Sequence, residues 1–238
     1  METNLYHIIV PAYHEGNNIL DELQELVDIL GKNSIEFNLT VVDDGSNDNT
    51  LEMIESFADN RENVESISYD VNHGKGYALR KGVSKIDTEP HYVIFFDADG
   101  DIRPESVVWM IESLSGEDVL AASKWHEDSQ VNYPVERVIL SKIFNLYTKL
   151  YLGLDIRDTQ TGLKMFRFGI LDDLISYSKL NGYAFDTELL YLARKKSINV
   201  KEVPVRLDFG HGSSLGISSM LRIFLDVLKI GSRRLSVF

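Results

Sequence analysis

Short apolar runs alternate with helical patterns through the first half of this chain, and this alternation limits the fold more than any other feature. The apolar runs, each bounded by turn residues, are Tyr6–Pro11, Leu39–Val42, Val64–Tyr69, Tyr92–Phe96 and Val119–Ala122. Between them, residues 17–30 place apolar side chains on one helical face, and Thr50–Ala58 follows a capping Asp48 or Asn49. Strands that alternate with helices form a mostly parallel sheet. The sequence therefore predicts an α/β fold.

The pattern changes after residue 123. We expect a long helix from Pro134 to about Leu152, a strand near Leu163–Phe168, a helix over Phe185–Lys195, a strand over Val200–Val205 and an amphipathic segment over Ser218–Lys229. No internal repeat or low-complexity linker separates the two halves. In an open α/β sheet, ligands bind beyond the carboxyl ends of the strands. The functional residues are therefore sought in the loops that follow the predicted strands.

The charge of the chain is uneven. It has 24 basic and 37 acidic side chains, a formal net charge of −13, of which residues 1–120 carry −18 and residues 121–238 carry +5. This balance argues against general nucleic-acid binding, because neutralising phosphates needs a basic surface. The absence of cysteine excludes disulfides, zinc–cysteine sites and thiol catalysis.

The apolar runs are short. None approaches the roughly 18 residues of a membrane-spanning helix. The first ten residues show no basic region before a long apolar core, so we expect no signal peptide. We expect a cytoplasmic protein.

Carboxylates follow two of the predicted strands. Asp97 and Asp99 come directly after Tyr92–Phe96, and Asp43 ends Leu39–Val42. Clustered carboxylates repel one another, and Mg²⁺ or Mn²⁺ relieves that repulsion. A turn is the other reading, because Asp and Gly favour turns, and for Asp44, Ser46 and Asp48 a turn or helix cap is preferred. The glycine-rich segment 73–76 lacks the spacing of the known phosphate-binding loops and is uninformative alone.

Taken together, these motifs resemble the family 2 nucleotide-sugar glycosyltransferases of the GT-A fold. The resemblance rests on Ile9-Val-Pro-Ala-Tyr-His-Glu-Gly, Val41-Val-Asp-Asp-Gly-Ser and Phe95-Phe-Asp-Ala-Asp, and it covers nearly the whole chain. In the second half, Arg157-Asp-Thr-Gln-Thr-Gly, Tyr183-Ala-Phe-Asp-Thr-Glu and Glu202-Val-Pro-Val are similar to the polyprenyl-phosphate sugar transferases. Dolichyl-phosphate β-glucosyltransferases are the best match, followed by dolichol-phosphate mannose synthases.

The resemblance implies a set of donor and metal residues. Asp97 and Asp99 would hold Mg²⁺ or Mn²⁺ on the donor diphosphate, and Asp97, Asp99 and Asp158 are the implied catalytic residues. Asp158 would face the donor sugar or help the acceptor. The implied nucleotide-binding residues are Pro11, Ala12, Tyr13, Glu15, Asp43, Lys75, Asp97 and Ala98. Of Asp186 and Glu188 in the second acidic motif, at most one is expected to reach the sugar, because they do not share a helical face.

The resemblance also implies an acceptor site. Arg137 and Ser141, four residues apart on one helical face, would hold a lipid phosphate together with Lys124. Composition alone permits a core helix with a solvated polar edge here, whereas the family places a membrane-facing helix at this point. The chain has Ala122-Ser-Lys124 where the family has Gly-Ser-Arg, and Gly212-Ser-Ser214 where it has Gly-Ser-Lys. For Ser218–Lys229, docking on protein and contact with anionic lipid both stay open.

From these features we expect a metal-dependent inverting enzyme that transfers one hexose from UDP-glucose or GDP-mannose to a polyprenyl or dolichyl phosphate. Residues 1–212 would form the GT-A catalytic domain, with a nucleotide-sugar-binding half (1–123) and an acceptor half (124–212), followed by an amphipathic segment (213–238). The enzyme would associate peripherally with the inner face of the cell or ER membrane. Two alternatives are transfer to a hydroxyl of a glycan and a nucleotide-sugar-binding protein without transferase activity.

Overall fold

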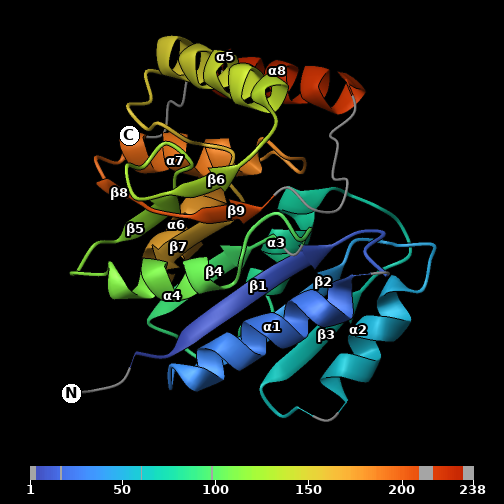
Figure 1. The fold of residues 1–238 in the computed structure, drawn as a ribbon. Coiled ribbons are helices and arrows are strands. Elements are labelled where there is room, and N and C mark those ends of the chain that lie inside the picture. The colour runs from blue at the N-terminus through green and yellow to red at the C-terminus, as the bar shows by residue number, and fades with distance from the viewer. Residues whose placement is uncertain (1–3, 17, 60, 98, 209–216, 233–238) are drawn as a thin grey trace.

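A mixed sheet runs through the centre of the protein, whose computed structural model describes residues 4–16, 18–59, 61–97, 99–208 and 217–232. The side chains of residues 135, 137 and 217–220 also lie outside this description. The described strands of the sheet are β1 (Tyr6–Ala12), β2 (Phe37–Asp43), β3 (Val64–Ser68), β4 (Tyr92–Phe96), β5 (Val119–Ala122), β7 (Leu163–Arg167) and β8 (Val200–Val203). Their order is β3-β2-β1-β4-β7-β5-β8. All run in one direction except β7, which is antiparallel to β4 and β5 (Figure 1).

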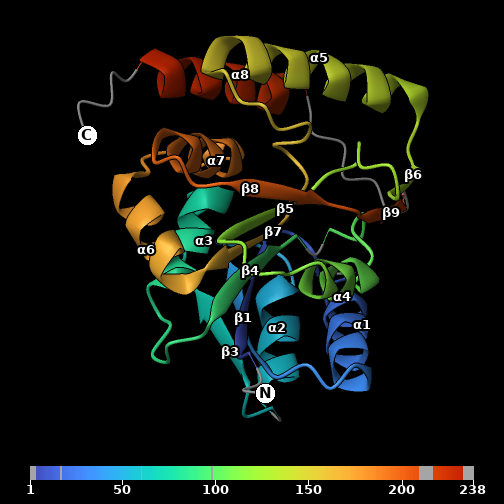
Figure 2. The same cartoon turned by 90° about the vertical axis from the view of Figure 1, so that its left-hand side faces the viewer.

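Helices cover both faces of this sheet. One face carries α1 (Ile19–Lys32), α2 (Thr50–Ala58) and α4 (Glu105–Glu112), and the other carries α3 (Lys75–Val83), α6 (Phe168–Tyr177) and α7 (Phe185–Lys195) (Figure 2). Two further helices, α5 (Val135–Leu152) and α8 (Ile217–Ser232), contact each other and form an outer layer above α7. A short parallel pair, β6 (Gln130–Asn132) and β9 (Arg206–Asp208), lies beside the main sheet.

Alternation along the strands produces two apolar cores. On β1, Ile8 and Val10 pack with Leu23 and Leu26 of α1, whereas the intervening Ile9 belongs to the core under α3 and α7. Successive side chains of a strand point to opposite faces, so a fully apolar strand needs a helix on each side. This explains why the central strands read as continuous apolar runs in the sequence.

The predicted fold class is confirmed. The strands at Tyr92–Phe96 and Val119–Ala122 and the helices at Thr50–Ala58 and Phe185–Lys195 have the predicted bounds. The strand expected over Val200–Val205 is shorter and ends at Val203 as β8, because the chain then leaves the main sheet. Strand β9, which begins at Arg206 and pairs with β6, was not predicted. Helices α4 and α6 and strand β6 had no counterpart in the prediction.

The C-terminal segment predicted as amphipathic contains α8. This helix buries Ile223, Val227 and Ile230 and exposes Leu221, Leu225 and Leu228. It therefore has apolar side chains on two sides. Within the described residues, no helix has both the length and the hydropathy needed to cross a bilayer.

One buried histidine predicts how stability depends on pH. His7 on β1 has its Nε2 2.8 Å from Thr40 Oγ1, and burial lowers its pKa from 6.5 to about 4. Between about pH 6.5 and pH 4, His7 binds a proton in the unfolded chain but not in the folded protein. The free energy of unfolding therefore decreases as the pH falls through this range. Above about pH 6.5 the folded protein has the full benefit of a neutral His7. Relative to acid pH, this adds roughly 3 kcal/mol to the free energy of unfolding.

We expect His7→Gln to lack this part of the acid sensitivity. Urea unfolding at about pH 7, 5 and 4 measures it for both proteins. An equal loss of stability in wild type and His7→Gln over this interval would contradict the prediction.

Candidate active site

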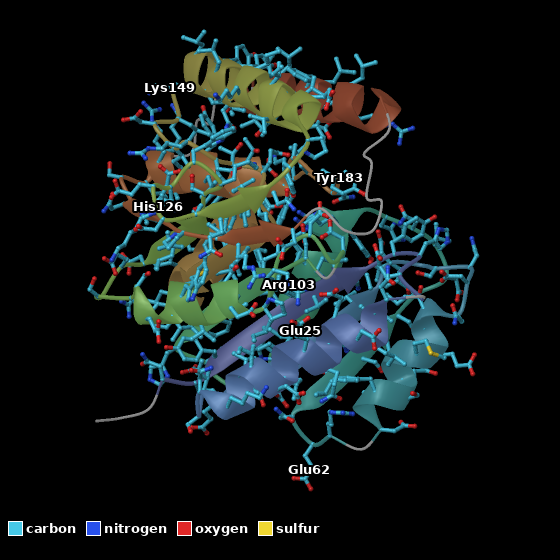
Figure 3. All side chains as sticks on the ribbon, in the orientation of Figure 1. Glu25, Glu62, Arg103, His126, Lys149 and Tyr183 are labelled. Atoms are coloured by element: carbon cyan, nitrogen blue, oxygen red, sulfur yellow. The ribbon has the colours of Figure 1, made fainter. Side chains whose placement is uncertain are left out.

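The strands that run in one direction end at the same edge of the sheet, which gathers the polar loops of the sequence there. Asp43 ends β2, Asp97 follows β4, and Lys124 lies two residues after β5. Because β7 runs the opposite way, the loop before it, residues 158–162, reaches the same edge. In Figure 3, Tyr183 lies on the side of the molecule where β1 ends.

Lys75 joins two carboxylates at this edge. Its Nζ lies 2.7 Å from Asp97 Oδ2 and 2.8 Å from Asp186 Oδ2. Burial opposes the charge on Lys75, but the two carboxylates raise its pKa, so the ammonium stays charged. The Asp97 N–H donates to the Gly162 carbonyl at 3.0 Å, which fixes the backbone on the other side. The first residue of the predicted metal motif is therefore held from both sides.

The free oxygen of Asp97 and the neighbouring Asp99 fit a divalent cation. Asp97 Oδ1 is buried and has no hydrogen-bond partner among the described residues, whereas Oδ2 is held by Lys75. Burial and the charges of Asp97 and Asp101 raise the pKa of Asp99 to about 7, because neighbouring negative charges oppose its ionisation. Hard carboxylate oxygens suit Mg²⁺ or Mn²⁺.

In the part of the chain that the structure describes, no group of three or more His, Asp or Glu side chains is arranged to hold a metal ion. Asp97 and Asp99 would therefore hold a cation together with water or substrate oxygens, as magnesium sites commonly do. Ala98, the middle residue of this motif, lies outside the described residues.

The predicted nucleoside residues lie at the ends of β1 and β2. Asp43 is buried and accepts the Ser46 N–H at 3.2 Å through Oδ2, whereas no residue that the structure describes bonds its Oδ1. Pro11 and Ala12 are in β1, and Tyr13 is exposed, with its ring stacked on His14. The Glu15 carboxyl belongs to the acidic cluster, because burial, Asp48 and Asp97 raise its pKa to about 7.

Asp44, the neighbour of Asp43, anchors a distant loop. Its buried carboxylate accepts the Tyr69 hydroxyl at 2.7 Å, the Asn72 amide at 2.9 Å and the N–H groups of His73 and Gly74 at 2.9 and 2.7 Å. These contacts shape the turn that leads into Lys75. Asp44 therefore places Lys75, a role beyond the local turn or cap expected from the sequence.

Asp158 and Lys124 form a buried ion pair. Lys124 Nζ lies 2.6 Å from Asp158 Oδ2, which also accepts the Lys124 N–H and the Thr161 hydroxyl. The N–H groups of Gln160 and Thr161 donate to Oδ1. Burial raises the pKa of Asp158, but Lys124 and these hydrogen bonds hold it below its ordinary value. In this arrangement Asp158 orients Lys124, and its predicted contact with the sugar stays a prediction.

The two acidic residues at the start of α7 have different surroundings. Asp186 pairs with Lys75 and Lys164, whereas Glu188 accepts the backbone N–H groups of Lys179 and Leu180 at 2.9 and 2.8 Å. Asp186 therefore lies beside Asp97, and Glu188 holds the preceding loop.

Two residues near the site were not identified from the sequence. Lys164 is fully buried within β7, and a charged residue inside an apolar strand was a signal that could have been noticed. Tyr183 lies near the carboxylates, since burial and the charge of Asp97 raise its pKa. No sequence pattern singled out Tyr183.

The predicted acceptor residues on α5 are only partly described. Ser141 is half-buried, and the side chain of Arg137 lies outside the described residues. The same holds for residues 212–214, the departure from the family pattern noted above. Only Lys124 among the three predicted acceptor residues is placed at the sheet edge, through its ion pair with Asp158.

Gly162 offers a direct test of the Asp97 position. A Cβ at Gly162 would lie 1.8 Å from Asp97 Oδ2, so Gly162→Ala must displace this carboxylate. We expect Mn²⁺ affinity, followed by titration calorimetry, to fall by about tenfold or more, because a displacement of about 1 Å is sufficient for such losses. Gly169→Ala is the matched control, since an added Cβ there would meet no described atom within 4 Å apart from its chain neighbours and the backbone of its own helix. Equal Mn²⁺ affinity of the two variants would show that Asp97 does not take part in cation binding.

Comparison with known proteins gives the family. The family model described as Glycosyl transferase family 2 matches residues 7–175. The dolichyl-phosphate beta-glucosyltransferase of Dictyostelium discoideum is 28% identical over 98% of this chain and 76% of its own length. The enzyme of the same name from Saccharomyces cerevisiae is 28% identical over 89% of this chain and 69% of its own.

Solved structures share the fold. Mannosyl-3-phosphoglycerate synthase from Rubrobacter xylanophilus aligns with a TM-score of 0.71 at 21% identity, over 98% of this chain and 74% of the other. Glucosyl-3-phosphoglycerate synthase from Mycobacterium tuberculosis, crystallised with Mn²⁺, UDP and phosphoglyceric acid, aligns with a TM-score of 0.71 at 18% identity, over 95% of this chain and 77% of the other. With the family match across most of the chain, these findings show that the protein belongs to glycosyl transferase family 2 and is a glycosyltransferase.

Proposed function

We propose that this glycosyltransferase transfers one hexose, with inversion at the anomeric carbon, from a nucleotide sugar to a polyprenyl phosphate such as dolichyl phosphate. The observation that carries the proposal is the arrangement of Asp97, whose Oδ2 is held by Lys75 while Oδ1 has no hydrogen-bond partner in the described part of the chain. The similar curated proteins are named dolichyl-phosphate beta-glucosyltransferases, so glucose from UDP-glucose is the proposed donor sugar. GDP-mannose is the second donor to test.

In the proposed donor site, the charged groups of Asp97, Asp99 and Lys75 would act on the nucleotide sugar from the positions that the fold gives them. Asp97 Oδ1 and Asp99 would hold Mg²⁺ or Mn²⁺, which supplies neutralisation of the negative charge that grows on the leaving diphosphate. Asp43 Oδ1, buried without a partner, would accept a hydrogen bond from the base or ribose. Lys75 keeps Asp97 in place and adds a fixed positive charge beside the diphosphate.

The state of Asp158 favours a phosphate acceptor over a hydroxyl. A sugar hydroxyl needs a general base, but both oxygens of Asp158 already accept hydrogen bonds. A phosphate monoester, with a second pKa near ~6, is mostly ionised at neutral pH and needs positioning cations instead. Lys124, held by Asp158, is such a cation, and Arg137 and Ser141 are proposed to complete the phosphate site.

The surface of α5 fits a lipid-linked acceptor. Its apolar side chains Ile139, Ile143, Leu146 and Leu150 are exposed, whereas Thr148, on the same helical face as Ser141, is fully buried. A core helix would show the opposite orientation. The exposed Leu221, Leu225 and Leu228 of α8 add apolar surface from the neighbouring helix. An exposed apolar surface of this kind suits the interface of a bilayer, where we propose that the enzyme acts at the cytoplasmic face.

Transfer assays with UDP-glucose and GDP-mannose test the function. With extracted polyprenyl phosphate as acceptor, we expect release of UDP, loss of turnover in chelator and recovery with Mn²⁺. Asp99→Asn should lower kcat/KM by about 100-fold or more, because it removes a charge that holds the cation at the leaving group. Asp70→Asn, a change at an exposed aspartate, is the control. Unaffected turnover in chelator, or wild-type activity of Asp99→Asn, would rule out the metal role.

Vesicle binding tests the membrane surface. The triple variant Ile143→Ser, Leu146→Ser and Leu150→Ser removes three exposed apolar side chains from α5. We expect its sedimentation with phosphatidylcholine–phosphatidylserine vesicles to fall by about tenfold or more relative to wild type. Val71→Ser, at a loop side chain that is 61% exposed, is the control and should bind as wild type does. Equal vesicle binding by the triple variant would refute a role of α5 in membrane contact.

A further inference from the structure

Lys164 is a charged residue in the middle of the sheet. It lies on β7, pairs with Phe95 of β4 and Ala121 of β5, and has a fully buried side chain. Its Nζ donates to the Thr161 carbonyl at 2.6 Å and lies 3.4 Å from Asp186 Oδ1. The neighbours of Lys164 along β7 are Leu163, Met165 and Phe166, all apolar and buried.

Stability of the fold does not account for this charge. Burying an ammonium costs several kcal/mol, and exchanging a buried ion pair for apolar groups is often neutral or stabilising. Burial lowers the pKa of Lys164 even though Asp186 opposes the shift. The reason for a lysine at this position is therefore sought in the two groups that its Nζ contacts, the Thr161 carbonyl and the Asp186 carboxylate.

Each partner of Lys164 leads to one side of the site. Asp186 binds Lys75, which holds Asp97 Oδ2, on the donor side. Thr161, whose carbonyl Lys164 holds, donates its hydroxyl to Asp158 Oδ2, the oxygen that binds Lys124. The buried ammonium of Lys164 thus connects Asp97, on the sugar-donor side, to the Lys124–Asp158 pair.

We propose that Lys164 is a positioning residue that keeps Asp97 and the Lys124–Asp158 pair in one fixed arrangement during transfer. This inference rests on the proposed function, since it assigns the two sides to donor and acceptor. Asp97, Asp186, Lys75 and Lys164 form a group of two negative and two positive charges. Without Lys164, Lys75 alone serves the buried Asp186 and the half-buried Asp97, and the Thr161 carbonyl loses the Lys164 donor. Both sides then lose their fixed position.

Lys164→Met, which keeps side-chain length and removes the charge, is the test. Lys201→Met is the matched control, because Lys201 Nζ also binds a carbonyl, Ser113 O at 2.6 Å, and a carboxylate, Glu117 Oε1 at 2.9 Å, in the loop before β5. We measure thermal unfolding, the affinity for UDP with Mn²⁺ by calorimetry, and kcat and KM for transfer from UDP-glucose to polyprenyl phosphate.

We expect folded Lys164→Met to lose about 10- to 100-fold in kcat/KM and about tenfold in UDP–Mn²⁺ affinity, as for residues that orient metal ligands. Lys201→Met should stay within about twofold of wild type in both. The double variant Lys164→Met, Asp186→Asn should lose less free energy of binding and transfer than the two single losses added together, because both changes break the Lys164–Asp186 pair.

Wild-type UDP–Mn²⁺ affinity and kcat/KM in folded Lys164→Met would overturn the inference. If Lys164→Met fails to fold, the same measurements are made on Lys164→Gln. This variant removes the charge but keeps an N–H donor for the Thr161 carbonyl. A folded Lys164→Gln with wild-type values, or failure of both variants to fold, would assign Lys164 to the fold alone and overturn it too. Absence of nucleotide binding and transfer in the wild type would instead refute the proposed function.

Discussion

The ammonium of Lys75, held between Asp97 and Asp186, is the interaction on which the site depends. A parallel sheet brings its strand ends together, and in this chain those ends carry carboxylates that repel one another. Lys75 neutralises one oxygen of Asp97 and leaves the other without a hydrogen-bond partner among the described residues, so the cluster is compatible with folding and would still suit the proposed cation. Asp44 shapes the turn before Lys75, and Asp186 holds its Nζ from α7.

Much of the fold follows from local patterns in the sequence. The apolar run Tyr92–Phe96 is a strand because a helix covers each face of the sheet, and its bounds agree with the prediction. The direction of β7 had no local signal, because apolar residues indicate a strand and not its orientation. Helix α6 begins at Phe168 directly after β7, without the polar turn that marks the other boundaries, and it was missed for that reason.

The sequence likewise predicts some residues of the site and not others. The strand-end aspartates Asp43, Asp97 and Asp99 were predictable, because each follows an apolar run. The partners of these groups were not, since Lys75 and Asp186 lie far apart in sequence and meet only through packing of α3 and α7. The outward orientation of the apolar face of α5 also depends on tertiary contacts. The charge split of −18 and +5 is not repeated in the site, because Lys75 comes from the first half and Asp158 and Asp186 come from the second.

The chemical bond in the product tests the account most directly. A hexose joined to a lipid phosphate is an anomeric phosphate diester and is cleaved by mild acid, whereas an ordinary glycoside resists it. After incubation with labelled UDP-glucose, Mn²⁺ and polyprenyl phosphate, we predict label in the organic-solvent extract that mild acid releases as free hexose. Acid-stable label in the extract, or label that enters only a glycan, would contradict transfer to a lipid phosphate.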